Sequence, residues 1–335
     1  MIFSKASGVN DSFFGKSQEP IRLMMEKDIE AFENESALPK IFKEVKSNNF
    51  AEKFTSKTSL KNFEAVEEGG AYPKTDMQEG FSKVVEPVTW KQSFTVTKEM
   101  IEDNKILDIK NNALGFTQSF GRTKEMFGAA LLMGAVTGTP ATFGGQTFNV
   151  NSADGVALFS KVHPSVVDES KKQSNIFKDG FSVDALSALE CKMNDFKDDN
   201  GYVLSVAPDT IVIPNDYELK TAVFAAVGAD KDPNTANNGF NYQFGRWNII
   251  VWNQLNPLVT STNPKPFILL DSKYNDRAGG AVWVNRVALE VKSHIDDNND
   301  NNVFKGRARF TAGFNNWRAL AIGGISTGDA LLKSA

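Results

Sequence analysis

The longest regular pattern of apolar residues along the chain is typical of one long α-helix. Between residues 97 and 136 the apolar positions step by three, four or seven, which places them in one stripe on a helix. The stripe consists of Ile106, Ile109, Ala113, Phe116, Phe120, Phe127 and Leu131. About thirty residues at ~1.5 Å each give a helix of roughly 45 Å. Gly115, Gly121 and Gly128 lie within it, and each either weakens the helix or lets another segment approach closely.

A second pattern, alternation of apolar and polar residues, predicts a strand just before this helix. Val88, Trp90, Phe94 and Val96 face one side, and the Thr, Lys and Ser residues between them face the other. Glycines and prolines interrupt the preceding residues, so an extended hairpin with a loose tip is predicted from about residue 62. Because a two-stranded ribbon is only marginally stable in water, we expect its apolar residues to find partners outside the ribbon.

The last part of the chain predicts a long antiparallel hairpin. Apolar residues from Trp283 to Ile295 alternate with charged ones, and a second alternating strand covers residues 303–312. The Asp- and Asn-rich residues 296–302 form the turn between these strands. A final apolar strand at 318–324 precedes a polar tail.

Residues 155–265 are predicted to form a compact α/β unit. A helical face at 183–196 is followed by a short buried strand that ends at Pro214. A second helix then begins with a capping-box-like pair, Asn215 and Glu218. Further apolar runs at 246–252 and 267–271 predict strands.

The first 47 residues are polar, with one helical candidate at 20–35. No partner face lies near this helix in the sequence. We therefore interpret it as part of an arm that docks elsewhere.

Composition is that of a folded protein and limits the classes of function. Of 335 residues, 41% are hydrophobic and 23% are charged, a balance that argues against disorder. The net charge of −4 gives no general attraction to nucleic acid or to anionic membranes. No signal peptide and no long apolar run is recognisable, so we expect no membrane association. The single cysteine, Cys191, lies on a helical pattern and is predicted to be a small core residue.

Residues that carry catalysis or metal binding are sparse. His163 and His294 are the two histidines, neither has a second ligand at helical or strand spacing, and both are predicted to be structural. The Gly-rich residues 138–148 lack the lysine of a phosphate-binding loop, and the acidic turn lacks the Gly and distal Glu of a calcium loop. We expect no catalytic residue, no cofactor and no metal. A hydrolase with an unrecognised carboxylate site stays open as an alternative.

Arg307 and Arg309 lie on one side of the returning strand of the last hairpin. They either form part of a solvated sheet face or meet carboxylates of a neighbouring subunit or DNA.

The order of these parts resembles the major capsid protein of tailed bacteriophages over about residues 48–325. "VTKEMIEDN" (96–104) is similar to the family's transition from a strand into its long "spine" helix, and "MFGAALLMGAVTGTP" (126–140) to the glycine-containing exit from that helix. "LSVAPDTIVIPNDYELKTAVFAAV" (204–227) resembles the strand–proline–helix unit of the family's axial (A) domain. "VALEVKSHIDDNNDNNVFKGRARFTAGFNNWRALA" (287–321) resembles the hairpin of its peripheral (P) domain, running into a last A-domain strand.

This resemblance implies an α+β fold of the Hong Kong 97 phage capsid type. The expected parts are an N-terminal arm (1–47), an extended E-loop hairpin with its base (48–96), a P domain (97–154 and 271–315), an A domain (155–270 and 316–327) and a tail (328–335).

The resemblance also implies a structural protein and no enzyme. Copies would self-assemble as hexamers and pentamers into an icosahedral head shell that encloses dsDNA without sequence-specific binding. A separate scaffolding protein and a portal would be partners, with assembly in the host bacterial cytoplasm and final localisation in the virion. An encapsulin-like compartment, which encloses enzymes, is the alternative. The candidate contacts between subunits are Tyr72, Lys74, Phe81, Val88, Trp90, Phe94, Arg307 and Arg309.

Overall fold

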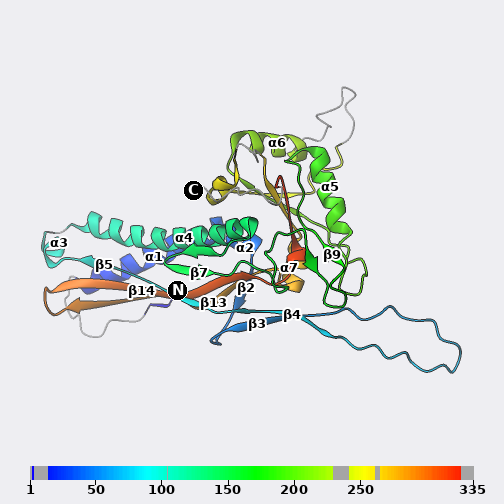
Figure 1. Cartoon of the computed structure of the whole chain (residues 1–335). Coiled ribbons are helices and arrows are strands. Elements are labelled where there is room, and N and C mark those ends of the chain that lie inside the picture. The colour runs from blue at the N-terminus through cyan, green and yellow to red at the C-terminus, as the bar shows by residue number, and fades with distance from the viewer. Residues whose placement is uncertain (1, 4–13, 104, 229–240, 261–264, 326–335) are drawn as a thin grey trace.

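A long lobe, an upper lobe and one projecting limb can be distinguished in the computed structural model (Figure 1). The structure describes residues 2–3, 14–103, 105–228, 241–260 and 265–325. In Figure 1 the long lobe lies on the left, the upper lobe rises from its right end, and the limb extends to the lower right.

The long lobe is a sheet with helix α4 (Ile106–Thr137) along one face. Its strands are ordered β1-β13-β14-β5, and β2 also pairs with β13. Their bounds are β1 Ile2–Phe3, β2 Lys43–Lys46, β5 Val88–Val96, β13 Ala281–Asp296 and β14 Asn301–Phe314. The predicted hairpin of β13 and β14, with its turn between Asp296 and Asn301, is confirmed.

The alternation of residues in the strands explains how this sheet packs on α4. Phe94 and Phe304 are register partners, and their rings stack with centroids 4.8 Å apart. Phe116 of α4 lies 5.3 Å from the ring of Phe94. Gly306 allows this close approach, because a Cβ there would clash with the ring of Phe116. The odd-numbered residues of β14 face away from α4.

The predicted long helix is present, but its first turn is separate. Thr97 accepts a hydrogen bond from the Met100 amide at 3.3 Å and caps α3 (Lys98–Glu102). Helix α4 then begins at Ile106 and ends at Gly138, which adopts a left-handed φ of 68°.

The predicted arm helix is α1 (Phe14–Glu35), and its partner is α4 of the same chain. Met25 and Ile29 are buried. A Cβ at Gly121 of α4 would lie 2.7 Å from the ring of Phe32, so the absence of a side chain at Gly121 permits the contact. The arm therefore docks along the long lobe.

The upper lobe contains a four-stranded sheet ordered β11-β10-β12-β15. β10 is parallel to β11 and antiparallel to β12, and β15 is antiparallel to β12. The strands are β10 Thr210–Pro214, β11 Asn248–Trp252, β12 Phe267–Leu270 and β15 Leu320–Gly323, and the helices are α5 Val183–Asn194 and α6 Tyr217–Gly228. All of these elements were predicted from the sequence. Cys191 is a correction: it is exposed, because α5 buries Leu186, Leu189 and Met193 instead.

Short elements complete the chain. They are α2 Leu38–Ile41, β3 Glu52–Lys57, β4 Glu79–Val85, β6 Ala141–Phe143, β7 Gln146–Phe148, β8 His163–Pro164, β9 Lys172–Gln173, the 3-10 helix η1 Asn253–Leu258, α7 Ser272–Ala278 and the 3-10 helix η2 Trp317–Ala319.

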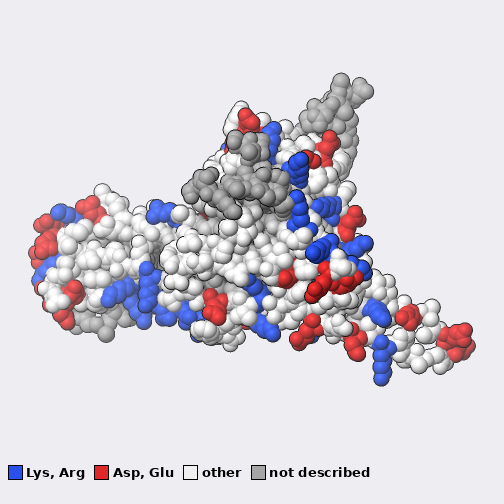
Figure 2. Space-filling view, viewed as in Figure 1, with Lys and Arg blue, Asp and Glu red and all other residues white. Residues whose placement is uncertain are grey.

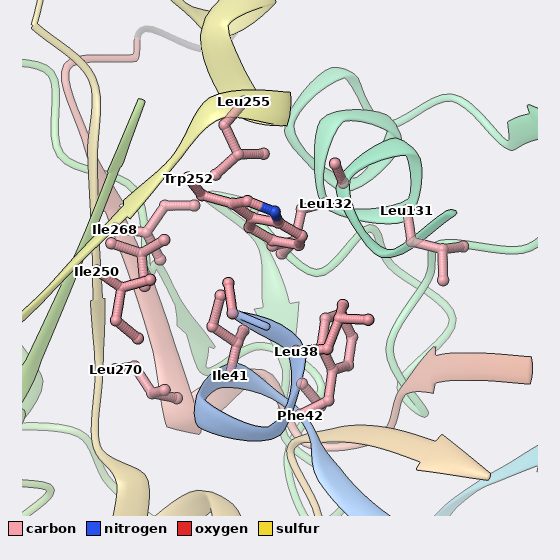
Figure 3. Packing of buried hydrophobic residues seen from close by; sticks show 14 of the residues in the cluster. Leu38, Ile41, Phe42, Leu131, Leu132, Ile250, Trp252, Leu255, Ile268 and Leu270 are labelled. Carbon is pink, nitrogen blue, oxygen red and sulfur yellow. The ribbon is translucent and has the colours of Figure 1, made fainter. Parts of the chain in front are cut away.

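A continuous apolar core joins the two lobes where α2, α4 and the end of β11 meet. Figure 3 shows the Trp252 ring next to Leu132, with Leu131 to the right and with Leu38 and Phe42 below.

Glu125 of α4 lies at this junction and is buried. Its Oε1 accepts hydrogen bonds from the Ser36 hydroxyl at 2.5 Å and the Ala37 amide at 3.1 Å. Its Oε2 accepts one from the indole N–H of Trp252 at 2.5 Å. One carboxylate thus links the arm, the long helix and the upper lobe.

Candidate assembly interface

The limb, residues 58–78, connects β3 to β4 and carries apolar side chains that its own chain does not cover. Outside a turn at its tip it has no regular secondary structure. Phe63 is 107% exposed and Tyr72 is 92% exposed, which means that both side chains are fully in water. The other large apolar residues exposed on the limb are Leu60, Val66 and Met77. Burial of one such side chain contributes about 1.5–3 kcal/mol, so the limb gains from any surface that covers it.

The root of the limb is fastened to its own chain. The Thr58 amide donates to the Gln78 carbonyl at 3.0 Å, and the Gln78 amide donates to the Thr58 hydroxyl at 3.0 Å. Ser59 donates its hydroxyl to Asp198, and the side chain of Asn200 donates to the Ser59 carbonyl at 2.6 Å. The limb therefore leaves the body from a fixed point while its tip stays uncovered (Figure 1).

The loop that holds the root is itself held by Arg318, whose Nη2 lies 3.1 Å from Asp199 Oδ1. Both side chains are about nine-tenths buried, at 10% and 9% exposure. This ion pair connects the limb to the end of the upper-lobe sheet.

A buried polar network lies under strand β4, which leads out of the limb. Lys83 donates from Nζ to the Asn151 carbonyl at 2.8 Å. Burial lowers the pKa of Lys83, although the charge of Asp154 opposes this shift. Asp154 Oδ2 lies 2.6 Å from Nδ1 of His163, and the imidazole stacks on Trp317 with centroids 4.2 Å apart.

Burial alone would raise the pKa of Asp154, but several interactions outweigh burial and hold the pKa below its usual value. These are the hydrogen bond and charge of His163, and the hydrogen bonds from Ser152 and Val156. Nε2 of His163 lies 3.2 Å from the Asn175 side-chain oxygen, so both ring nitrogens have partners within the fold.

The residues predicted to contact other subunits fall into three groups. Tyr72 and Lys74 are exposed on the limb, and Phe81 is half-buried on β4. Val88, Trp90 and Phe94 are partly buried and pack against the core of their own chain, so their role as contacts between copies stays a prediction.

Trp90 shows how these residues pack within their own chain. Its ring lies 5.3 Å from Phe310 and 5.5 Å from Phe127, and its indole N–H donates to the Phe310 carbonyl at 3.1 Å. The alternating pattern identified the apolar face of β5, but the partner of that face is α4, which follows β5 in the same chain.

Arg307 and Arg309 form the third group and lie on the sheet face opposite to α4. Arg307 Nη1 is 3.8 Å from Glu290 Oε2 and remains about half exposed, at 47%. Arg309 donates from Nη2 to the Pro87 carbonyl at 3.4 Å. A shallow hollow of about 450 Å³ lies on this face, between Lys91, Lys292 and Arg307.

Within the described residues, no group of three or more His, Cys, Asp and Glu side chains is placed to hold a metal ion. No helix in that part of the chain is both long and apolar enough to span a bilayer.

A family model described as "Phage capsid protein" matches residues 80–323. The chain belongs to the phage capsid protein family. The match includes α4, the upper-lobe sheet and the hairpin of β13 and β14. As a phage capsid protein, the chain is a structural subunit that assembles with copies of itself into a capsid shell, and the shell is part of the virion.

Solved structures of capsids share the fold of this phage capsid protein. A chain from the "Capsid of empty GTA particle computed with C5 symmetry" is 11% identical with a TM-score of 0.53, covering 88% of this chain and 90% of that one. A chain of Mycobacterium phage Bobi is 12% identical with a TM-score of 0.50, covering 87% and 90%. No curated protein matches the sequence. The α+β fold expected from the resemblance is thereby confirmed.

Proposed function

We propose that this capsid protein builds the icosahedral head of a tailed phage from hexamers and pentamers, in which the limb of each copy lies over a neighbouring copy. The proposal rests on the limb. Five large apolar residues project from a fastened root and are exposed in their own chain. A folded subunit gains from covering them only when another molecule supplies the surface.

The proposal divides the chain as follows: residues 1–47 form the arm, 48–96 the E-loop and its base, 97–154 with 271–315 the P domain, and 155–270 with 316–327 the A domain. The tail, 328–335, lies outside the described residues. In support of this division, α4, β13 and β14 lie in the long lobe, and β10, β11, β12 and β15 form the sheet of the upper lobe.

The enclosed genome, the partners and the place of assembly belong to the same proposal. The shell holds dsDNA by confinement without sequence-specific binding, a separate scaffolding protein and a portal take part, and assembly occurs in the host bacterial cytoplasm. The subunit has no catalytic activity.

Electron microscopy of purified protein tests the proposal. The wild-type chain is expected to form closed shells, alone or with scaffolding protein. A variant in which a short Gly-Ser turn replaces residues 61–75 is expected to keep its circular dichroism spectrum and to form no shells. The proposal fails if the wild-type chain stays monomeric under all assembly conditions, or if the shortened variant forms shells equally well.

The contents of the shells distinguish the alternatives. Phage particles contain DNA, whereas shells that co-purify with an enzyme would indicate an encapsulin-like compartment. Hydrolytic turnover that a single Asp or Glu substitution abolishes would indicate an enzyme.

A further inference from the structure

The sheet face opposite to α4 carries more positive charge than its own chain neutralises. We call Lys91, Lys292, Lys305 and Arg307 the basic face; all four are exposed. Lys305 is the register partner of Lys292, and Arg307 is the register partner of Lys91. Like charges directly opposite each other destabilise a pair of strands. This part of the sheet therefore repels itself in an isolated subunit.

One carboxylate lines the hollow on this face. Glu290 lies 3.8 Å from Arg307 and stands against four cationic side chains. Nζ of Lys305 lies 3.2 Å from Nε2 of His294, which adds no negative charge. The face thus presents four cationic side chains against one carboxylate, and a carboxylate-bearing segment would fit it.

Two further arginines lie near one end of the basic face in the register of the sheet. Nε of Arg309 and Nη1 of Arg286 are buried and have no hydrogen-bond acceptor within the described part of the chain. Arg309 is two residues from Arg307 on β14, and Arg286 adjoins Val287, the register partner of Arg309. Buried donors without acceptors are unfavourable, so this end of the sheet carries positive charge that its own chain leaves without hydrogen-bond acceptors.

The tip of the limb has the complementary charge. Residues 62–72 contain Glu64, Glu67 and Glu68 and no Lys or Arg. All of these residues are exposed. Figure 2 shows acidic residues at the far end of the limb and basic residues along the long lobe. The limb of the same copy points away from the basic face, because its root is fastened at Ser59.

We propose that the acidic limb tip of one copy binds the basic face of a second copy. The inference rests on the proposed function and adds the chemistry of the contact. Carboxylates of Glu64, Glu67 and Glu68 accept hydrogen bonds from the Lys and Arg side chains of the basic face. Phe63 and Tyr72 cover the aliphatic parts of those side chains.

The contact is sensitive to salt. The Debye length falls from about 10 Å at 0.1 M salt to about 3 Å at 1 M, so added salt screens opposite charges on the two copies. We expect assembly to weaken as the sodium chloride concentration rises.

Reversing the charges of the limb tip and of the basic face, separately and together, tests the proposal in the full-length chain. Glu67→Lys with Glu68→Lys reverses the tip, and Lys305→Glu with Arg307→Glu reverses the face. Each double variant is expected to keep its thermal midpoint and to lose about tenfold or more in shell yield, because like charges now meet. The four substitutions together are expected to restore most of the yield. Lys110→Glu with Arg122→Glu, on the exposed side of α4, is the matched control and is expected to assemble normally.

A binding measurement separates failure of this inference from failure of the proposed function. The probe is a fluorescent peptide of residues 59–77, which needs no fold of its own because the limb has no regular structure. The target is the full chain with its limb shortened. Fluorescence anisotropy is expected to show binding that salt weakens, and that Lys305→Glu with Arg307→Glu abolishes.

The outcomes are distinct. Peptide binding to the basic face without any wild-type shells would support the inference and reject the proposed function. Wild-type shells without peptide binding, or without any effect of charge reversal, would overturn the inference. A face-reversed variant that assembles normally and loses only its DNA would overturn it too, and would assign the face to DNA.

Discussion

Asp154 and His163 form a buried hydrogen-bonded pair, with Oδ2 of the carboxylate 2.6 Å from Nδ1 of the imidazole. Their side chains are 2% and 0% exposed. Lys83, which follows the limb on β4, lies close enough to Asp154 for the two charges to interact. Strand β4, which follows the limb, therefore lies next to two buried titratable groups, Asp154 and His163.

The stability of the subunit is expected to fall in acid through Asp154. Its folded pKa is below the usual value, so its contribution is complete above the unfolded pKa of about 3.9 and is lost as the pH falls through the folded pKa. Asp154→Asn is expected to be less stable than wild type by about 1–3 kcal/mol near pH 7. The difference is expected to shrink as the pH falls below about 4.

Thermal unfolding between neutral pH and acid checks this prediction. Asp179→Asn, at an exposed carboxyl, is the control. A constant difference between wild type and Asp154→Asn across the whole pH range would contradict it.

Glu125 is expected to be essential for joining the lobes. Glu125→Ala leaves Ser36, Ala37 and Trp252 without their acceptor, at a loss of about 3 kcal/mol or more. Glu125→Gln keeps one acceptor oxygen and is expected to lose less. Denaturant unfolding followed by tryptophan fluorescence measures both. A Glu125→Ala variant as stable as wild type would show that these hydrogen bonds do not contribute to stability.

Alanine substitutions of Trp90 and Tyr72 are expected to differ in their effects on subunit stability. Trp90→Ala removes a ring packed on Phe127 and Phe310 and is expected to destabilise the subunit by about 3 kcal/mol. Tyr72→Ala changes an exposed side chain and is expected to alter subunit stability by less than about 0.5 kcal/mol. Shell yield should fall for Tyr72→Ala nonetheless. A stable Trp90→Ala subunit with a specific assembly defect would instead show that Trp90 contacts another copy.

Gly→Ala substitutions in α4 are expected to raise or lower stability according to the space around each glycine. Gly115 has no atom near the position of a Cβ, so Gly115→Ala is expected to stabilise the helix by about 0.5–1 kcal/mol. Gly121→Ala would press on Phe32 and Gly128→Ala on Leu38, and each is expected to destabilise by about 1–3 kcal/mol. The thermal midpoint is expected to rise for Gly115→Ala and to fall for Gly121→Ala and Gly128→Ala. A shift of all three midpoints in the same direction would contradict this prediction.

Residue patterns revealed the elements of this fold more completely than the partners of those elements. The stripe from Ile109 to Leu131 and the alternation in β14 follow directly from helix and strand geometry, so the helix and hairpin were predictable. The spacing of apolar residues shows which side of a helix or strand is apolar, but it does not show which segment packs against that side. The pattern at Trp90 therefore identified an apolar face, but it gave no sign that α4 of the same chain packs against part of that face.

The candidate interface was predictable in part. Glycines, prolines and charges identified the loose tip around Tyr72, because such a segment cannot form a core. The basic face depends on the register that brings Lys292 beside Lys305 and Lys91 beside Arg307, and this register joins strands far apart in the sequence. Glu125 gave no sequence signal, since an isolated Glu on a helix usually faces water.

The fastened root of the limb determines how an isolated copy behaves. Thr58 and Ser59 hold the root, and the apolar side chains of the tip are exposed in a lone copy, so each copy presents an uncovered apolar end. When the surface that receives this end is a different one, copies join head to tail, and every open row keeps one unsatisfied end. Growth stops only when the last copy meets the first.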